Sequence, residues 1–545
     1  MNKETELMKK IMDKFNTKTQ KKNDHKNKMK NTNKQSPLSS SLDENIDAIK
    51  RDLGASSDIV FRTFAFGQEG KHKIGIIFTD GLVDSMIVQD VILKTLMVDL
   101  RDAYLKSDST VKVSELLQNH SLNGGEMEKV FDLKEIKQSI LSGDTAILID
   151  SESTGFTIDT RGWEQRGVDE PSTQTVVRGP KEGFVESIRT NTALVRRKIK
   201  SEKLWIEEMK IGEETNTDIA ILYMKGIANE KVLKEVRSRL NRIKIDGVFE
   251  GGTLEELIQD ETFTPFPTIF NTERPDAAAS NLLEGRIVII IDGTPFALIA
   301  PALFVQFLQS SEDYYQRSDM ATFIRLLRYF AFMLALLVPS AYIAVTTFHQ
   351  EMLPTTLLVS LAAQREGVPF PAFVEAIFME ITFEILREAG LRMPRAIGSA
   401  ISIVGALVLG QAAVEAGIVS SSMVIVVSLT AISSFVIPEY NLAIAVRLLR
   451  FIFMILAATF GLIGIILGLV VMIIHLSSLR SFGIPYLSPM APYNKAGQKD
   501  SLIRVPQWAL ASRPRLISQK DTKREDTPAP EPKDSERTFN EENGE

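Results

Sequence analysis

Residues Tyr329–Phe348 read YFAFMLALLVPSAYIAVTTF, a stretch of twenty residues without a charged side chain. A helix of this length measures about 30 Å, which matches the hydrocarbon core of a bilayer. Pro339 stands in its middle and predicts a kink. The stretch therefore predicts a transmembrane helix.

The apolar character continues to Leu479, whereas the chain before Asp319 carries charges throughout. Further spans fit at Ala396–Gly417, Ile418–Pro438 and Phe451–His475. The count is then four, with five or six possible. Segment 353–388 is apolar but contains several glutamates, which favours an amphipathic or re-entrant path. Residues 321–480 are thus expected to form an all-α, polytopic transmembrane domain.

Helical and extended patterns alternate before this domain, which predicts an α/β soluble N-terminal region. We expect two α/β cytosolic subdomains, at 42–155 and 156–295, and an interfacial connecting helix at 296–320. The remaining segments are expected to be a disordered Lys-rich tail, a juxtamembrane segment and a disordered acidic tail, at 1–41, 481–518 and 519–545.

Arginine residues flank the apolar block and predict its orientation. They stand at Arg317, Arg325 and Arg328 before it, and at Arg480 and Arg504 after it. Under the positive-inside rule, both termini and the soluble domain face the cytoplasm and the number of spans is even. The polar N-terminus lacks the apolar stretch of a signal peptide, so insertion is expected to use the internal spans.

Signals for an enzyme or a metal site are absent from the sequence. The chain has no cysteine, and its five histidines are scattered. No P-loop, dinucleotide-binding, nucleophile-elbow or zinc-protease motif occurs. We therefore expect no catalytic residues, no cofactor, no metal and no nucleic-acid partner.

Three glutamates stand out in the segment before the second predicted span. Glu380, Glu384 and Glu388 follow one another at helical spacing, so their carboxylates share one face. Repeated around an oligomer, such a face would form stacked carboxylate rings, which favour cations. The alternative is a solvated face on which Glu384 pairs with Arg387.

Gln411 and Glu415 are a second candidate for the ion path, because they lie one turn apart near the end of a predicted span. An ionisable group at that depth usually faces water or a polar partner. Its closeness to the interface also permits an ordinary position at the membrane surface.

Small residues recur every four positions in two predicted spans and let helices approach closely. The first stripe is Gly398, Ser402, Ala406 and Gly410. The second lies in the last span and contains Gly461, Gly464 and Gly468. The pattern fits packing within one subunit and packing between subunits equally well.

Several stretches resemble the A subunits of GerA-type spore germinant receptors. They are RGPKEGFVESIRTN at 178–191, ERPD at 273–276, LEGR at 283–286, IDGTP at 291–295, PFP at 369–371, REAGLR at 387–392, GQAA at 410–413 and FVIP at 435–438. The resemblance covers about 42–479, with the motifs in the order that the family shows.

The resemblance implies a subunit of a nutrient germinant receptor in the spore inner membrane, which triggers germination. It also implies two partners, a transporter-like B subunit and a lipoprotein C subunit. The A subunit is expected to form a homo-oligomer among the membrane lipids and to release monovalent cations when nutrient binds. The alternatives are a secondary transporter of the nutrient, or a membrane-anchored signalling scaffold without conduction. No internal symmetry of the kind that transporters show is visible among the spans.

Overall fold

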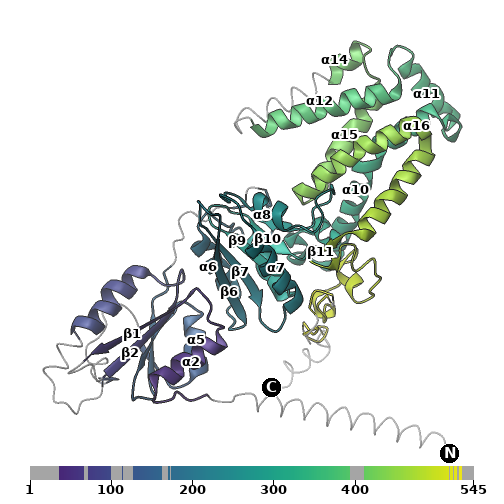
Figure 1. Cartoon of the computed structure of the whole chain (residues 1–545). Helices are drawn as coiled ribbons and strands as arrows, with labels where there is room; N and C mark the ends of the chain where they lie inside the picture. Colours follow the sequence, from purple (N-terminus) through teal and green to yellow (C-terminus); the bar gives the residue numbers. More distant parts are fainter. Residues whose placement is uncertain are drawn as a thin grey trace, which may run out of the picture. The chain divides into compact units, whose positions relative to one another are not determined.

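The computed structural model describes residues 36–66, 72–99, 113–114, 127–162, 170–171, 173–392, 410–514, 516–518, 521–524 and 527–530. The chain forms two compact units, and Figure 1 labels their elements. The first unit comprises residues 1–164 with 200–203, and the second comprises 165–199 and 204–545. The predicted tails lie mostly outside the described residues.

The first unit contains a five-stranded antiparallel sheet of order β1-β2-β4-β5-β3. Its strands are β1 (Ile59–Phe66), β2 (His72–Thr79), β3 (Met127–Val130), β4 (Asp144–Ile149) and β5 (Gly155–Asp159). Helices α2 (Leu42–Asp52) and α5 (Leu133–Ile140) pack on one face, where Ile49 and Ile136 are fully buried. The other face is covered by π-helical turns at Ile87–Leu93 and Thr95–Asp99.

The second unit begins with another five-stranded antiparallel sheet, of order β6-β7-β9-β10-β8. Its strands are β6 (Leu204–Ile211), β7 (Thr217–Met224), β8 (Phe270–Thr272), β9 (Ile287–Ile291) and β10 (Ala297–Ala300). Helices α6 (Ile188–Lys198) and α9 (Pro275–Leu283) cover one face of this sheet. Helices α7 (Glu230–Arg242) and α8 (Gly251–Ile258) cover the other. We call this part the second α/β domain.

The two α/β domains share one topology. Each strand of the second sheet occupies the position of the strand five numbers lower in the first. A helix precedes the first strand of each sheet, and another lies between the third and fourth strands. The prediction of an α/β region with two subdomains is thus confirmed, although all described strand pairs are antiparallel.

The interfacial helix predicted at 296–320 is not present. Ala297–Ala300 forms β10 and pairs with β8 and β9, and two short 3-10 turns follow at Phe304–Leu308 and Ser311–Tyr314. The prediction was wrong because a short apolar run fits a buried strand as well as a helix. The subdomain boundaries also shift, since β5 belongs to the first sheet.

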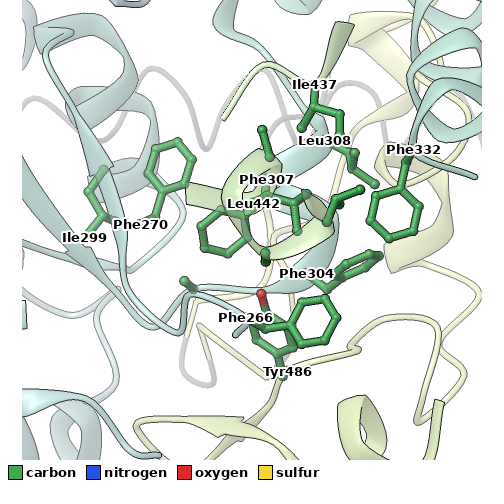
Figure 2. Packing of buried hydrophobic residues seen from close by; sticks show 14 of the residues in the cluster. Phe266, Phe270, Ile299, Phe304, Phe307, Leu308, Phe332, Ile437, Leu442 and Tyr486 are labelled. Carbon is green, nitrogen blue, oxygen red and sulfur yellow. The ribbon is translucent and has the colours of Figure 1, made fainter. Parts of the chain in front are cut away.

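One hydrophobic core continues from the second α/β domain into the helices that follow it. Phe270 and Ile299 of the sheet pack with Phe304 and Phe307 of the connecting turn. Figure 2 shows these side chains together with Phe332, Leu442 and Tyr486. The predicted juxtamembrane segment joins the same fold, because Tyr486 is fully buried.

The remaining elements form a helical domain: α10 (Ser318–Thr347), α11 (Thr355–Arg365), α12 (Ala372–Arg392), α14 (Gly410–Glu415), α15 (Ser421–Val436) and α16 (Tyr440–Ser478). Within the described residues, α10 and α16 are long and apolar enough to cross a membrane, and α15 is a shorter apolar helix. The first predicted span is confirmed as a helix. The span predicted at 396–417 lies mostly outside the described residues.

Helix α16 is not one straight rod, because its backbone breaks at Gly461 (φ 62°, ψ −140°). A straight helix of its 39 residues would be about 58 Å long. Yet both ends contact the second α/β domain: Gln174 donates to Glu439 at 3.0 Å, and Thr264 bonds His475 at 2.9 Å. Figure 1 shows the resulting bend. The span predicted at 451–475 lies within α16, but it crosses the break and is therefore not one straight helix.

The glycines after the break pack against the first arm of α16 in the same chain. A Cβ on Gly464 would lie 2.2 Å from the carbonyl oxygen of Leu456. A Cβ on Gly468 would lie 2.8 Å from the ring of Phe453. The second stripe of small residues thus closes a helical hairpin within one subunit, one of the two possibilities that the sequence left open.

Replacing Gly461 with alanine should destabilise the hairpin. Its backbone lies in a region that residues with a Cβ rarely adopt, and the added Cβ would stand 2.7 Å from His349. We expect a loss of about 1–3 kcal/mol, seen as a lower melting temperature of the purified chain in detergent. Gly367→Ala is the control, since nothing lies within 4 Å of its added Cβ. Equal melting temperatures for the two variants would contradict the break.

Candidate functional site

Helix α12 carries four glutamates into the apolar helical domain. It follows Pro371, whose carbonyl accepts from the backbone amides of Val374 and Glu375. Its acidic residues Glu375, Glu380, Glu384 and Glu388 meet different surroundings as the helix passes α15 and α16. These surroundings decide what each carboxylate can do.

Glu380 forms a fully buried ion pair with Arg450 of the first arm of α16. Both side chains are 0% exposed, and Arg450 donates to one carboxylate oxygen at 2.5 Å. A charge without a partner at this position would be strongly unfavourable, since no water replaces the missing contact. The pair therefore fixes the middle of α12 against α16.

Glu384 pairs with Arg447 at 2.8 Å, one turn later on α12 and one turn earlier on α16. The alternative partner suggested by the sequence, Arg387, is not the one observed. Its guanidinium instead lies over the rings of Phe435 and Tyr440, at 5.4 and 5.7 Å from their centroids. Local spacing favoured Arg387, but the tertiary contact with α16 determines the partner.

Sequence reasoning missed Glu375, whose side chain is 0% exposed. One carboxylate oxygen accepts from Arg365 at 3.3 Å, and the other accepts from the amide and hydroxyl of Ser420 at 3.0 and 2.8 Å. Glu375 thus joins the start of α12 to the start of α15. It stands five residues before Glu380, outside the i, i+4 series, so that series gave no reason to single it out.

The other candidate ion-path residues are not part of this buried set. Glu388 pairs with Arg392 of its own helix at 2.7 Å, and both are exposed. Gln411 donates to Glu415 at 2.9 Å on the exposed surface of α14. The structure therefore brings Glu380 and Glu384 together with arginines of α16 and leaves Glu388, Gln411 and Glu415 on the surface of the chain.

The first stripe of small residues is described only at its end. Gly398, Ser402 and Ala406 lie outside the described residues. Gly410 is described, and its nearest contact is Val424 of α15, 3.8 Å from an added Cβ. For this stripe, packing within one subunit and packing between subunits both stay predictions.

The sequence motifs that carry the family resemblance meet where the second α/β domain joins the helices. Arg274, 2% exposed, donates to the carbonyls of Gln174 and Pro180 and to the carboxylate of Asp276. Tyr315, just before α10, donates its hydroxyl to the same carboxylate. The motifs at 178–191 and 273–276 thus have a structural role: they tie the second α/β domain to the start of α10.

Gln174 connects this junction to α16. Its amide nitrogen donates to Glu439, the residue before α16, and its amide oxygen accepts from Thr272 at 2.6 Å. Burial raises the pKa of the Glu439 carboxyl well above its ordinary value, and the Gln174 hydrogen bond opposes this only in part. Burial therefore favours the neutral acid at the entry to α16 more than it is favoured for an exposed glutamate.

A cavity of about 890 Å³ lies between the second α/β domain and the helices. Its walls include Arg274, Phe270 and Glu439 at one side and Phe383 and Arg387 of α12 at the other. Because two domains contribute its walls, a movement of α12 or of the junction changes its shape. No group of three or more metal-ligating side chains occurs in the part of the chain that the structure describes.

The sequence family described as Bacillus/Clostridium GerA spore germination protein matches residues 47–516. The chain belongs to the GerA family. It is 52% identical to spore germination protein KA of Bacillus subtilis over 483 residues, 88% of each chain. It is 39% identical to spore germination protein GerLA of Bacillus cereus over 479 residues, 88% of this chain and 96% of that one.

Two further proteins are similar to this chain. The uncharacterized membrane protein YfkQ of Bacillus subtilis is 45% identical over 500 residues, 91% of this chain and 95% of that one. The N-terminal domain of the A subunit of the Bacillus megaterium spore germinant receptor GerK3 is 42% identical, with a TM-score of 0.40. The match covers 50% of this chain and 99% of the GerK3 domain. From its family membership, its relatives and its two helices long enough to cross a membrane, this GerA chain is a spore germination protein associated with a membrane.

Removing the buried carboxylate should destabilise this GerA chain. Glu380→Gln leaves the Arg450 guanidinium buried without a counter-charge, which costs about 3–5 kcal/mol. Glu388→Gln removes a carboxylate of the exposed pair and should change stability by less than about 1 kcal/mol. Thermal unfolding of both variants in detergent provides the comparison. Similar melting temperatures would show that Glu380 is not buried as a charge.

Glu439→Gln should reduce the pH dependence of stability. Above the ordinary value of 4.5, the unfolded carboxyl is ionised, while the folded one stays protonated up to its raised pKa. Stability therefore falls as pH rises through this window, by up to about 1.4 kcal/mol per pH unit. The variant lacks this loss, so its melting temperature relative to wild type should be higher at pH 8 than at pH 5. An equal difference in melting temperature between variant and wild type at pH 5 and pH 8 would contradict the prediction.

Proposed function

We propose that this chain is the A subunit of a nutrient germinant receptor and that it conducts monovalent cations as a homo-oligomer when nutrient binds. Family membership supports the receptor role, since relatives are named spore germination proteins. The observation that carries conduction is the position of Glu380 and Glu384 inside an apolar helical domain. Ionisable groups in such surroundings are costly and commonly mark ion pathways.

The partners follow from the same proposal. A transporter-like B subunit holds the nutrient and a lipoprotein C subunit completes the receptor, while this chain supplies no enzymatic activity. The helical domain crosses the spore inner membrane several times, with the α/β domains on the core side. The junction of Gln174, Arg274 and Glu439 offers a direct mechanical connection between the second α/β domain and α16.

Conductance is the decisive measurement. The receptor, purified with its B and C subunits and placed in planar bilayers, should conduct potassium when a defined mixture of amino acids, sugars and nucleosides is added. Cross-linking of the same sample should show an oligomer of this chain. Uptake of labelled nutrient without conductance would indicate a transporter instead. Neither uptake nor conductance would indicate a scaffold.

Orientation is tested separately by thiol labelling. The chain has no cysteine, so Ser40→Cys and Ser512→Cys each create a single exposed thiol. Both positions should react with a membrane-impermeant maleimide only after the cells are permeabilised, because the flanking arginines predict that both ends face the cytoplasm. Labelling of either position in intact cells would contradict this orientation.

A further inference from the structure

Two ion pairs hold α12 against the first arm of α16, and their order shows how the helices run. Glu380 pairs with Arg450, and Glu384 pairs with Arg447. Residue numbers rise along α12 while those of the partners fall along α16. The two helices therefore lie antiparallel at this contact, joined by two successive charge pairs.

These pairs remove the carboxylates from any ion path in the observed conformation. A carboxylate attracts cations only when its charge is not balanced by a closer cation. Here Arg447 and Arg450 balance Glu384 and Glu380, and Arg387 of α12 lies beside them without an ion-pair partner among the described residues. The local charge is thus positive, which opposes the passage of cations.

The hydrogen bonds of this contact are incomplete. One oxygen each of Glu380 and Glu384 has no hydrogen-bond partner although it is buried, and the same holds for Nε and Nη2 of Arg450. A buried polar network with unmade bonds is costly, and a buried pair is close to balanced between desolvation and attraction. Closing the contact therefore leaves part of the desolvation of these groups uncompensated.

Glu375 provides the contrast on the same helix. Both of its oxygens have partners, on Arg365 and Ser420. The start of α12 is thus firmly attached to α15, whereas the part around Glu384 depends on the incomplete pairs. A movement of α12 therefore pivots about the start of the helix, and it separates the carboxylates of Glu380 and Glu384 from α16.

We propose that Arg447 and Arg450 are positioning residues that form a charge latch with Glu384 and Glu380. The closed latch keeps the two carboxylates out of the ion path, and its opening exposes them to cations. In this proposal, nutrient binding elsewhere in the receptor favours the open conformation and so shifts the population toward it. The charge latch rests on the proposed conduction and assigns its regulation to α16.

A charge exchange tests the latch without any nutrient. Arg447→Glu places two like charges in contact and should raise nutrient-independent potassium conductance at least tenfold. Adding Glu384→Arg restores an opposite-charge pair and should return this conductance toward the wild-type value. Arg392→Glu is the matched control, because Arg392 pairs with Glu388 on the exposed surface of the same helix. Arg447→Gln is used if Arg447→Glu does not fold.

A second readout separates the latch from the proposed function. A single cysteine at Phe383, which lines the cavity beside α12, should react several-fold faster with a soluble maleimide when Arg447 is Glu or Gln. A wild-type receptor that never conducts would remove the proposed function, while this labelling still reports on the latch. Unchanged labelling, or conductance that Glu384→Arg does not restore, would overturn the latch.

Discussion

The arrangement of the helical domain depends on the backbone break at Gly461. Both ends of α16 contact the second α/β domain, so the helix must return over its own length. Only a residue without a Cβ tolerates this backbone conformation beside His349. The fold-back places the first arm of α16 where α12 packs on it, and it brings the last arm back to the fully buried Tyr486. The backbone conformation of this one glycine thus determines which helices can meet.

Buried charge recurs at two levels of the second unit. At the junction, Arg274 and Asp276 have close partners from several segments and hold the second α/β domain to α10. Further along the helices, Glu380 and Arg450 pair across α12 and α16. Both sets contain buried polar atoms without a hydrogen-bond partner among the described residues. They differ in what they join: the junction connects segments of two domains, whereas the Glu380–Arg450 pair connects two helices of one domain.

The sequence predicts the fold class well, but it predicts poorly where individual helices and strands begin, bend and end. Alternation of helical and extended patterns identifies the α/β region, and the charge-free stretch at 329–348 identifies α10. The break at Gly461 escapes notice, because a glycine in an apolar helix also fits ordinary close packing. The strand at Ala297–Ala300 is misread as a helix, since its partners β8 and β9 are specified by tertiary contacts.

The candidate site shows the same limit. Helical spacing places Glu380, Glu384 and Glu388 on one face, but it cannot show that two of them meet arginines sixty-three and seventy positions later. It also favours Arg387 over Arg447, because local neighbours are the ones that spacing reveals. Glu375 lies outside that spacing, although its contacts join two helices.

The contact between Arg325 and Asp500 has a topological consequence. The two side chains meet at 2.8 Å, so the start of α10 and the segment after α16 lie on one side of the helical domain. A chain that starts and ends on the same side of a bilayer crosses it an even number of times. The hairpin at Gly461 keeps this number even, because its two arms either both cross or both do not. If the chain crosses a bilayer between these two points, the contact requires an even number of passages, whatever that number is.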